Sequence, residues 1–171
     1  KSRSRGLGDV YKRQVQRLAG AGLPYAEIDA VFITHHHSDH LTGLQDLVLT
    51  RWVMARGEVR PPFPIVVPAG PAESFVREML YPWRHDLDVR ATHANRSDPF
   101  TLDIVPFDLP DQPTEVWRRG DVRVLAGQVR HEPVHPAVGF RVETPDGIVA
   151  ITGDTLVCDE VAALAAGANV L

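Results

Sequence analysis

Short apolar runs alternate with amphipathic stretches along this chain, and this alternation predicts a mixed α and β fold. Apolar runs rich in β-branched residues and bounded by polar or turn residues predict buried strands, here at 28–33, 63–67, 102–107 and 122–125. Apolar residues repeated at helical spacing predict helices at 15–21, 41–47, 47–56, 72–80 and 159–166. Strands and helices therefore alternate, as they do in proteins of the α/β class.

Two further apolar runs, at 138–142 and 148–151, predict a β-hairpin. The connecting segment 144–147 reads Thr-Pro-Asp-Gly, and proline at the second position with glycine at the fourth suits a type I turn. Pro106 lies inside the strand predicted at 102–107. Because proline has no N–H to donate to a sheet, we expect this run at a sheet edge or at a strand end.

The segment 34–40 reads Thr-His-His-His-Ser-Asp-His and carries the most informative chemistry of the chain. Neutral imidazole nitrogens and carboxylate oxygens are the usual non-sulfur ligands of zinc. Residues i and i+2 share one face of an extended segment, so His35 and His37 point the same way after the strand at 28–33. The pattern therefore predicts a metal site at the end of this strand.

The same segment predicts a second pair of ligands at the start of a helix. Ser38 is a favourable N-cap residue, and a helix capped there has Asp39 and His40 in its first turn. These two side chains can then serve a second, adjacent metal ion. A solvated polar loop or an affinity tag is the alternative explanation of the histidines, but a tag is terminal and usually longer.

Later segments supply further candidate ligands. Asp154 follows the strand predicted at 148–151, and the preceding Gly153 permits the backbone to turn closely beside a metal. His131 and His135 both precede the hairpin, so they compete for one remaining histidine role. The residues alone leave that choice open.

Three segments together resemble the metallo-β-lactamase superfamily of metallohydrolases, in its ribonuclease Z-like branch. They are His35-x-His37-x-Asp39-His40 after a hydrophobic strand, the segment 129–143, and Ile-Thr-Gly-Asp-Thr at 151–155. The resemblance implies an α/β (α+β) fold, a four-layer αβ/βα sandwich. It also leads us to expect an incomplete domain, without the family's first hairpin, its final strand and helix, and its last histidine ligand.

The resemblance further implies a centre of two divalent metal ions. The implied ligands are His35, His37 and His131 for one ion, and Asp39 and His40 for the other, with Asp154 bridging both. The register of the family segment favours His131 over His135. Zinc is the expected metal, with manganese or iron as alternatives.

This set of ligands predicts a metal-dependent hydrolase. Paired divalent ions bring the pKa of water from 15.7 toward about 7 and polarise a phosphoryl or carbonyl oxygen. Asp39 is the candidate catalytic residue, which orients the attacking water or carries its proton. Phosphodiester hydrolysis of the ribonuclease Z type is the first expectation. Hydrolysis of a thioester, lactone or β-lactam and an inactive metal-binding domain are the alternatives.

The first fourteen residues differ in character from the rest. Residues 1–14 are basic and lack apolar periodicity, and 9–14 read as the translation of a transposon-end adapter used in sequencing libraries. We therefore predict a non-native segment at 1–14 and a single domain fragment at 15–171. A basic arm that binds nucleic acid is the alternative for residues 1–14.

The net charge argues against a large nucleic-acid partner. The chain has 18 basic and 22 acidic side chains, a net charge of −4. Residues 1–14 hold five of the basic and one of the acidic side chains, so 13 and 21 remain, a net charge of −8. Enzymes that grip large RNAs normally show a basic stripe. The prediction is therefore a small-molecule or nucleotide-like substrate in preference to a large RNA.

The remaining composition is that of an ordinary globular protein. One cysteine, Cys158, excludes an intramolecular disulfide and is compatible with a reducing cytoplasm, and no apolar run is long enough to span a bilayer. His85 and His93 stand among polar neighbours, which predicts exposed surface positions. A cytoplasmic location without a membrane partner is expected, and a homodimer is compatible with the sequence.

Overall fold

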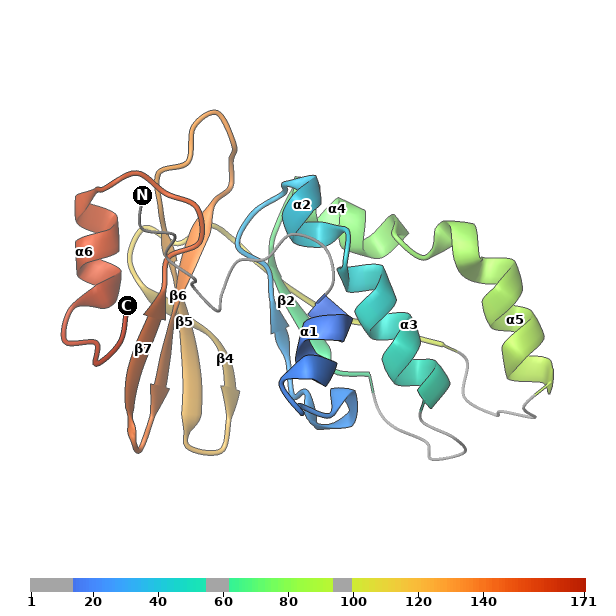
Figure 1. Cartoon of the computed structure of the whole chain (residues 1–171). Helices are drawn as coiled ribbons and strands as arrows, with labels where there is room; N and C mark the ends of the chain where they lie inside the picture. Colours follow the sequence, from blue (N-terminus) through green and yellow to red (C-terminus); the bar gives the residue numbers. More distant parts are fainter. Residues whose placement is uncertain (1–13, 55–61, 94–99) are drawn as a thin grey trace, which may run out of the picture.

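The computed structural model describes residues 14–54, 62–93 and 100–171 (Figure 1). The predicted adapter segment therefore lies outside the described residues, apart from Gln14, which begins helix α1 (Gln14–Gly20). The end of the helix predicted at 47–56 also lies outside them, beyond Met54.

The first sheet is parallel and contains three strands in the order β1-β2-β3. These strands are β1 (Val31–Phe32), β2 (Pro64–Pro68) and β3 (Asp103–Phe107). Three residues of β2, Ile65 to Val67, are at most 1% exposed, as expected for a strand covered on both faces. Pro106 lies in β3 at the edge of the sheet, which confirms its prediction from the sequence.

Helices cover the outer face of the first sheet. A parallel sheet needs crossover connections, and here they include α2 (Ser38–Leu41), α3 (Leu44–Met54), α4 (Pro71–Glu78) and α5 (Arg84–His93). Apolar residues of α1, α3 and α4 pack with β1 and β2 in one core cluster. This core supports the end of β1, where the histidine-rich segment begins.

The second sheet is an antiparallel meander in the order β4-β5-β6-β7. Its strands are β4 (Thr114–Arg119), β5 (Val122–Gln128), β6 (Val138–Thr144) and β7 (Gly147–Ile151). The β6–β7 hairpin has the predicted two-residue connection, Pro145 and Asp146. Helix α6 (Asp159–Ala165) packs against this sheet.

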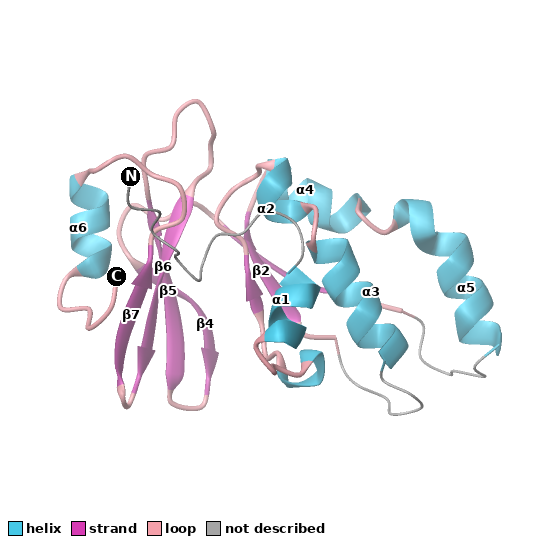
Figure 2. Ribbon diagram, viewed as in Figure 1, coloured by secondary structure: helices cyan, strands magenta, loops and turns pink. Residues whose placement is uncertain are grey.

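Aromatic and aliphatic side chains join the two sheets face to face. The ring of Phe32 in β1 lies edge-on to Trp117 and Phe140 of the second sheet, with centroids 5.6 and 5.4 Å apart. Helices lie outside both sheets, so the order of layers is helix, sheet, sheet, helix (Figures 1 and 2). The predicted four-layer sandwich of the α/β (α+β) class is confirmed.

Several local predictions differ from the structure. The strand predicted at 28–33 is shorter in the structure, where β1 covers Val31–Phe32 and the Ile33 N–H donates to the Val66 carbonyl at 2.9 Å. The short 3-10 helix η1 (Tyr25–Glu27) precedes it. The N-cap of α2 is His37 and not Ser38, and the predicted helix 41–47 is broken between α2 and α3. Asp39 and His40 nevertheless lie in the first turn of α2, as predicted.

The sequence analysis missed β4, the 3-10 helix η2 (Tyr81–Trp83) and α5. Helix α5 buries no residue, so it carries no apolar periodicity to detect. His85 and His93 lie on this helix and are exposed, as predicted. No helix in the three described ranges is both long and apolar enough to cross a membrane.

Candidate metal centre

The histidine-rich segment follows the carboxyl end of β1, where the two sheets come together. His35 forms an isolated bridge with Ala137, and the Val138 N–H donates to the Thr34 carbonyl at 3.0 Å. These contacts tie the segment to the start of β6. Ligands of parallel-sheet proteins commonly lie outside the carboxyl ends of the strands.

Three ring nitrogens converge at this point. His35 Nε2 lies 3.1 Å from His37 Nδ1, and His131 Nε2 lies 3.3 Å from the same His37 atom. A tetrahedral zinc ion with Zn–N bonds of 2.0–2.1 Å separates its ligand nitrogens by about 3.3–3.4 Å. The separations of His37 Nδ1 from the other two nitrogens therefore resemble those between nitrogens bound to one zinc ion.

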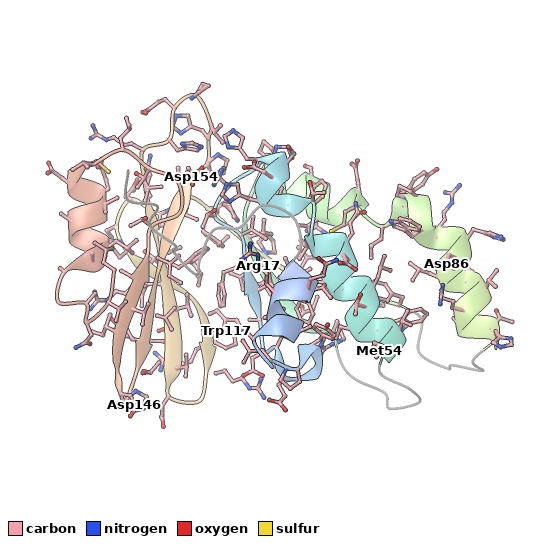
Figure 3. All side chains as sticks on the ribbon, viewed as in Figure 1. Arg17, Met54, Asp86, Trp117, Asp146 and Asp154 are labelled. Carbon is pink, nitrogen blue, oxygen red and sulfur yellow. The ribbon has the colours of Figure 1, made fainter. Side chains whose placement is uncertain are left out.

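A carboxylate completes the cluster. Ligand atoms of His35, His37, His131 and Asp154 all lie within 4.8 Å of one another. Figure 3 shows Asp154 at the end of the molecule near α2, opposite Asp146 at the tip of the β6–β7 hairpin. Imidazole and carboxylate donors suit zinc and other divalent transition metals, so the residues present fit a divalent metal ion.

A second group adjoins the first through Asp154. His40 Nε2 lies 3.4 Å from Asp154 Oδ2 and 3.8 Å from Asp39 Oδ2. The rings of His40 and His35 are also close, with centroids 4.4 Å apart. Asp154 thus lies close to both groups of predicted ligands.

Local backbone geometry explains how Asp154 reaches this position. Gly153 has φ +63, and a Cβ atom built there would lie 3.0 Å from Thr34 Cγ2. Only glycine adopts this conformation readily while packing so closely against the loop of His35. The predicted close turn at Gly153 is confirmed, and it brings the β7 loop against the β1 loop.

The two competing histidines lie in different places. His131 belongs to the cluster, whereas His135 is exposed on the surface of the same loop. Next to the cluster is a pocket of about 450 Å³. Its lining residues are His131, Glu132, Gly153, Asp154, Thr155 and Leu156.

The sequence analysis did not identify Thr34 as part of the site. Its Oγ1 lies 3.0 Å from His35 Nδ1, so an Nδ1–H of His35 can donate to the hydroxyl. That hydrogen bond leaves the Nε2 lone pair free for a metal, which is the usual role of a group hydrogen-bonded to a metal-binding histidine. The signal in the sequence was a hydroxyl residue directly before the first histidine.

Burial controls the protonation of His35, which is 0% exposed. Burial lowers the pKa of His35 from 6.5 to about 4, and the nearby His40 and His131 lower the same pKa. Asp154 opposes them by raising it. His35 is consequently neutral at pH 7, and a neutral imidazole is the form that binds metals.

The low pKa of His35 predicts a pH-dependent stability of the chain once metal has been removed by a chelator. Because the pKa is about 4 in the folded chain and 6.5 in the unfolded chain, the unfolded state binds more protons between these values. The contribution of neutral His35 to the unfolding free energy is therefore fully present above pH 6.5 and is lost as the pH falls toward 4. The difference corresponds to roughly 3 kcal/mol of unfolding free energy.

Urea unfolding between pH 4 and 7 measures this dependence. His35→Gln, which cannot titrate, should flatten the dependence across this range. His135→Gln is the matched control, because His135 is exposed. A His35→Gln variant with the same pH dependence as the unsubstituted chain would contradict the prediction.

Comparison with known proteins identifies the family of the chain. A family model described as "Beta-lactamase superfamily domain" matches residues 8–171. Ribonuclease Z of Mycobacterium bovis is 36% identical over 166 residues, which cover 96% of this chain and 58% of the relative. Ribonuclease Z of Mycolicibacterium paratuberculosis is 38% identical with the same coverage. The chain thus spans somewhat more than half the length of these relatives.

Solved structures show the same fold at lower identity. Human tRNase Z, short form, superimposes with a TM-score of 0.64 at 19% identity, covering 92% of this chain and 61% of that one. The metallo-β-lactamase fold protein YhfI of Bacillus subtilis gives a TM-score of 0.56 at 19% identity, covering 88% and 50%.

The names of these relatives correct the predicted substrate. The name ribonuclease Z denotes an enzyme that acts on RNA. This finding overturns the predicted preference for a small-molecule or nucleotide-like substrate over a large RNA. That prediction relied on a net charge of −8 for 15–171. Net charge is a sum over a whole chain, whereas phosphate binding depends on the local potential at one surface. From its family match and its fold, the chain belongs to the β-lactamase superfamily, with the metallo-β-lactamase fold.

Proposed function

We propose that the protein containing this chain is a metal-dependent phosphodiesterase that hydrolyses RNA, of the ribonuclease Z type. The observation that carries the proposal is the convergence of His35, His37 and His131, with nitrogens 3.1 and 3.3 Å apart, beside Asp154. Several relatives at 34–38% identity are named ribonuclease Z, which points to a phosphodiester of RNA as the bond that is broken.

We further propose that the site holds two divalent ions, zinc in the first instance. The residues that would hold one ion are His35, His37 and His131, and those for the other are Asp39 and His40, with Asp154 shared. When bound, such a pair supplies Lewis acidity toward a phosphoryl oxygen and lowers the pKa of water. The positive charge of the ions also explains how an acidic chain can accept a phosphodiester.

Asp39 is the residue that we propose for proton transfer. Its side chain is 36% exposed on the first turn of α2, so it can reach a water molecule from the solvent side. Its carboxylate lies beside His40, which places a hydrogen-bond acceptor at the rim of the cluster. A carboxylate in this position can orient the attacking water and accept its proton.

The pocket next to the cluster is the proposed place for the substrate. Two of the candidate ligands, His131 and Asp154, line it together with the exposed residues Glu132 and Leu156. A scissile phosphodiester in this pocket would lie against the candidate ligands. A cytoplasmic location, with which the single Cys158 is compatible, would give the enzyme access to RNA.

Turnover of two model substrates tests the proposed reaction. The zinc-loaded protein should hydrolyse a bis-aryl phosphodiester at least about tenfold faster than an aryl thioester. Asp39→Asn should lower phosphodiester turnover by about 10²-fold or more, the usual contribution of a general acid or base. Metal content is measured on the same samples by elemental analysis.

Asp146→Asn is the matched control for this experiment, since Asp146 is an exposed aspartate at the tip of the hairpin, away from Asp154 (Figure 3). It should leave turnover unchanged. Faster hydrolysis of the thioester would reject the proposed phosphodiesterase. Bound metal without turnover of either substrate would instead favour a metal-binding domain that lacks activity.

A further inference from the structure

We propose that Thr155 is a positioning residue that sets the separation of His131 and Asp154. The inference rests on the metal centre proposed above. Thr155 directly follows Asp154, and its partner Arg130 directly precedes His131. A contact between residues 130 and 155 therefore joins two loops at the points where each delivers a candidate ligand.

The hydroxyl of Thr155 lies among three backbone groups. The N–H of Arg130 donates to Thr155 Oγ1 at 3.2 Å, and the carbonyl oxygen of Arg130 is also 3.2 Å away. The carbonyl oxygen of Leu156 lies 2.9 Å from the same hydroxyl. A hydroxyl has one proton, so it donates to one carbonyl at a time while it accepts from the amide.

One backbone hydrogen bond reinforces the same link. The N–H of Leu156 donates to the Arg130 carbonyl at 2.8 Å. Valine or serine at position 155 leaves this bond in place, because it involves main-chain atoms alone. The contribution of the hydroxyl can therefore be measured while the loops stay connected.

The two linked loops have no regular secondary structure of their own. Residues 129–136 and 152–158 lie outside the helices and strands, so tertiary contacts fix the positions of their side chains. Groups that hold a metal ligand in place typically change metal affinity 10–100-fold when they are mutated. Because Thr155 acts through the backbone next to each ligand, we expect its loss to weaken metal affinity by about tenfold, the lower end of this range.

A surface ion pair connects the same regions and provides a control. Arg130 Nη2 lies 2.8 Å from Glu160 Oε1 at the start of α6, with side chains 57% and 35% exposed. Glu160 is half-buried, but the guanidinium of Arg130 is exposed to water, and ion pairs at the protein surface contribute little to stability. Glu160→Gln removes this pair and keeps the Thr155 hydroxyl, so it should leave metal binding unchanged.

The test compares Thr155→Val, Thr155→Ser and Glu160→Gln in the full chain, with cobalt(II) as the probe. Valine keeps the shape of threonine without its hydroxyl, whereas serine keeps the hydroxyl. We expect Thr155→Val to bind cobalt about tenfold more weakly and to change its visible absorption spectrum. Thr155→Ser should have the same cobalt affinity and spectrum as the unsubstituted chain. Each variant should also be folded after its metal has been removed by a chelator.

Two results would overturn the inference. One is a Thr155→Val variant that binds cobalt as tightly as the unsubstituted chain, and the other is a serine variant as weak as the valine variant. If Thr155→Val does not fold, Thr155→Ala replaces it with the same expectations. If the unsubstituted chain binds no cobalt, the proposed metal centre itself is wrong. This outcome distinguishes failure of the proposed function from failure of the role of Thr155.

Discussion

Replacing His37 with alanine is expected to reduce metal affinity by more than about 100-fold, which exceeds the usual effect of losing a group outside the ligand set. His37 Nδ1 is the atom shared by both short distances of the cluster, 3.1 Å to His35 Nε2 and 3.3 Å to His131 Nε2. Its removal takes away the central one of the three histidine nitrogens in the proposed site and leaves His35, His131 and the shared Asp154.

Turnover of the His37→Ala variant should fall together with its metal affinity. At a metal concentration that saturates the unsubstituted protein, the loss of turnover should be orders of magnitude. Asp154→Ala is expected to act similarly, because Asp154 lies within reach of His40 and of the three-histidine cluster. Metal content by elemental analysis and phosphodiester turnover are the two measurements. Each variant is compared with the unsubstituted protein at equal zinc concentration.

His135→Ala is the matched control, since His135 is an exposed histidine of the same loop as His131. It should keep both metal content and turnover. Normal metal content together with near-normal turnover in His37→Ala would reject the proposed ligand set. Loss of metal in His135→Ala would show that the loop, and not its ligand, controls binding.

Leu164→Ala should lower the unfolding free energy by about 2–5 kcal/mol, the range typical of a buried leucine. Leu164 is 0% exposed on α6 and packs against two glycines that are paired across β5 and β6, Gly127 and Gly139. A Cβ atom built at Gly139 would lie 2.7 Å from Leu164 Cδ2, and one at Gly127 would lie 3.1 Å from Leu164 Cδ1. The leucine therefore fills a hole that the missing glycine side chains create.

A double-mutant cycle with Gly127 tests this packing. Gly127→Ala alone should destabilise the chain, because its new methyl group meets Leu164 at 3.1 Å. In Gly127→Ala with Leu164→Ala the methyl group occupies part of the cavity, so the combined loss should be smaller than the sum. Urea unfolding measures all four proteins. Leu23→Ala, at a leucine 56% exposed, is the control and should change stability by less than about 0.5 kcal/mol.

An additive result in this cycle would contradict direct packing of Leu164 against Gly127. The cycle also bears on function, because α6 follows the loop that carries Asp154. Metal affinity of Leu164→Ala, measured where the variant is still folded, would show whether the position of α6 affects the ligand loop.

The β6–β7 hairpin and the buried strand β2 were predictable because their signals are local. A strand with apolar residues on both faces, or a turn with proline and glycine at set positions, is encoded within a few neighbouring residues. Helix α5 gave no such signal, since its residues are mostly exposed and it buries none. The break between α2 and α3 lies at Thr42 and Gly43. It was missed because Leu41 and Leu44 on either side keep helical spacing, and the low helix propensity of a single glycine is a weak signal.

The sequence by itself determined the chemistry of the candidate centre, because the segment between one strand and one helical turn holds His35, His37, Asp39 and His40 within six residues. The family resemblance indicated His131 and Asp154 as the distant partners, and only the tertiary structure brings them to this segment. His131 is 94 residues from His37, and its place in the cluster depends on the pairing of the sheets and on the loops beyond them. The substrate prediction failed for the same physical reason, since net charge carries no information about where charges lie in space.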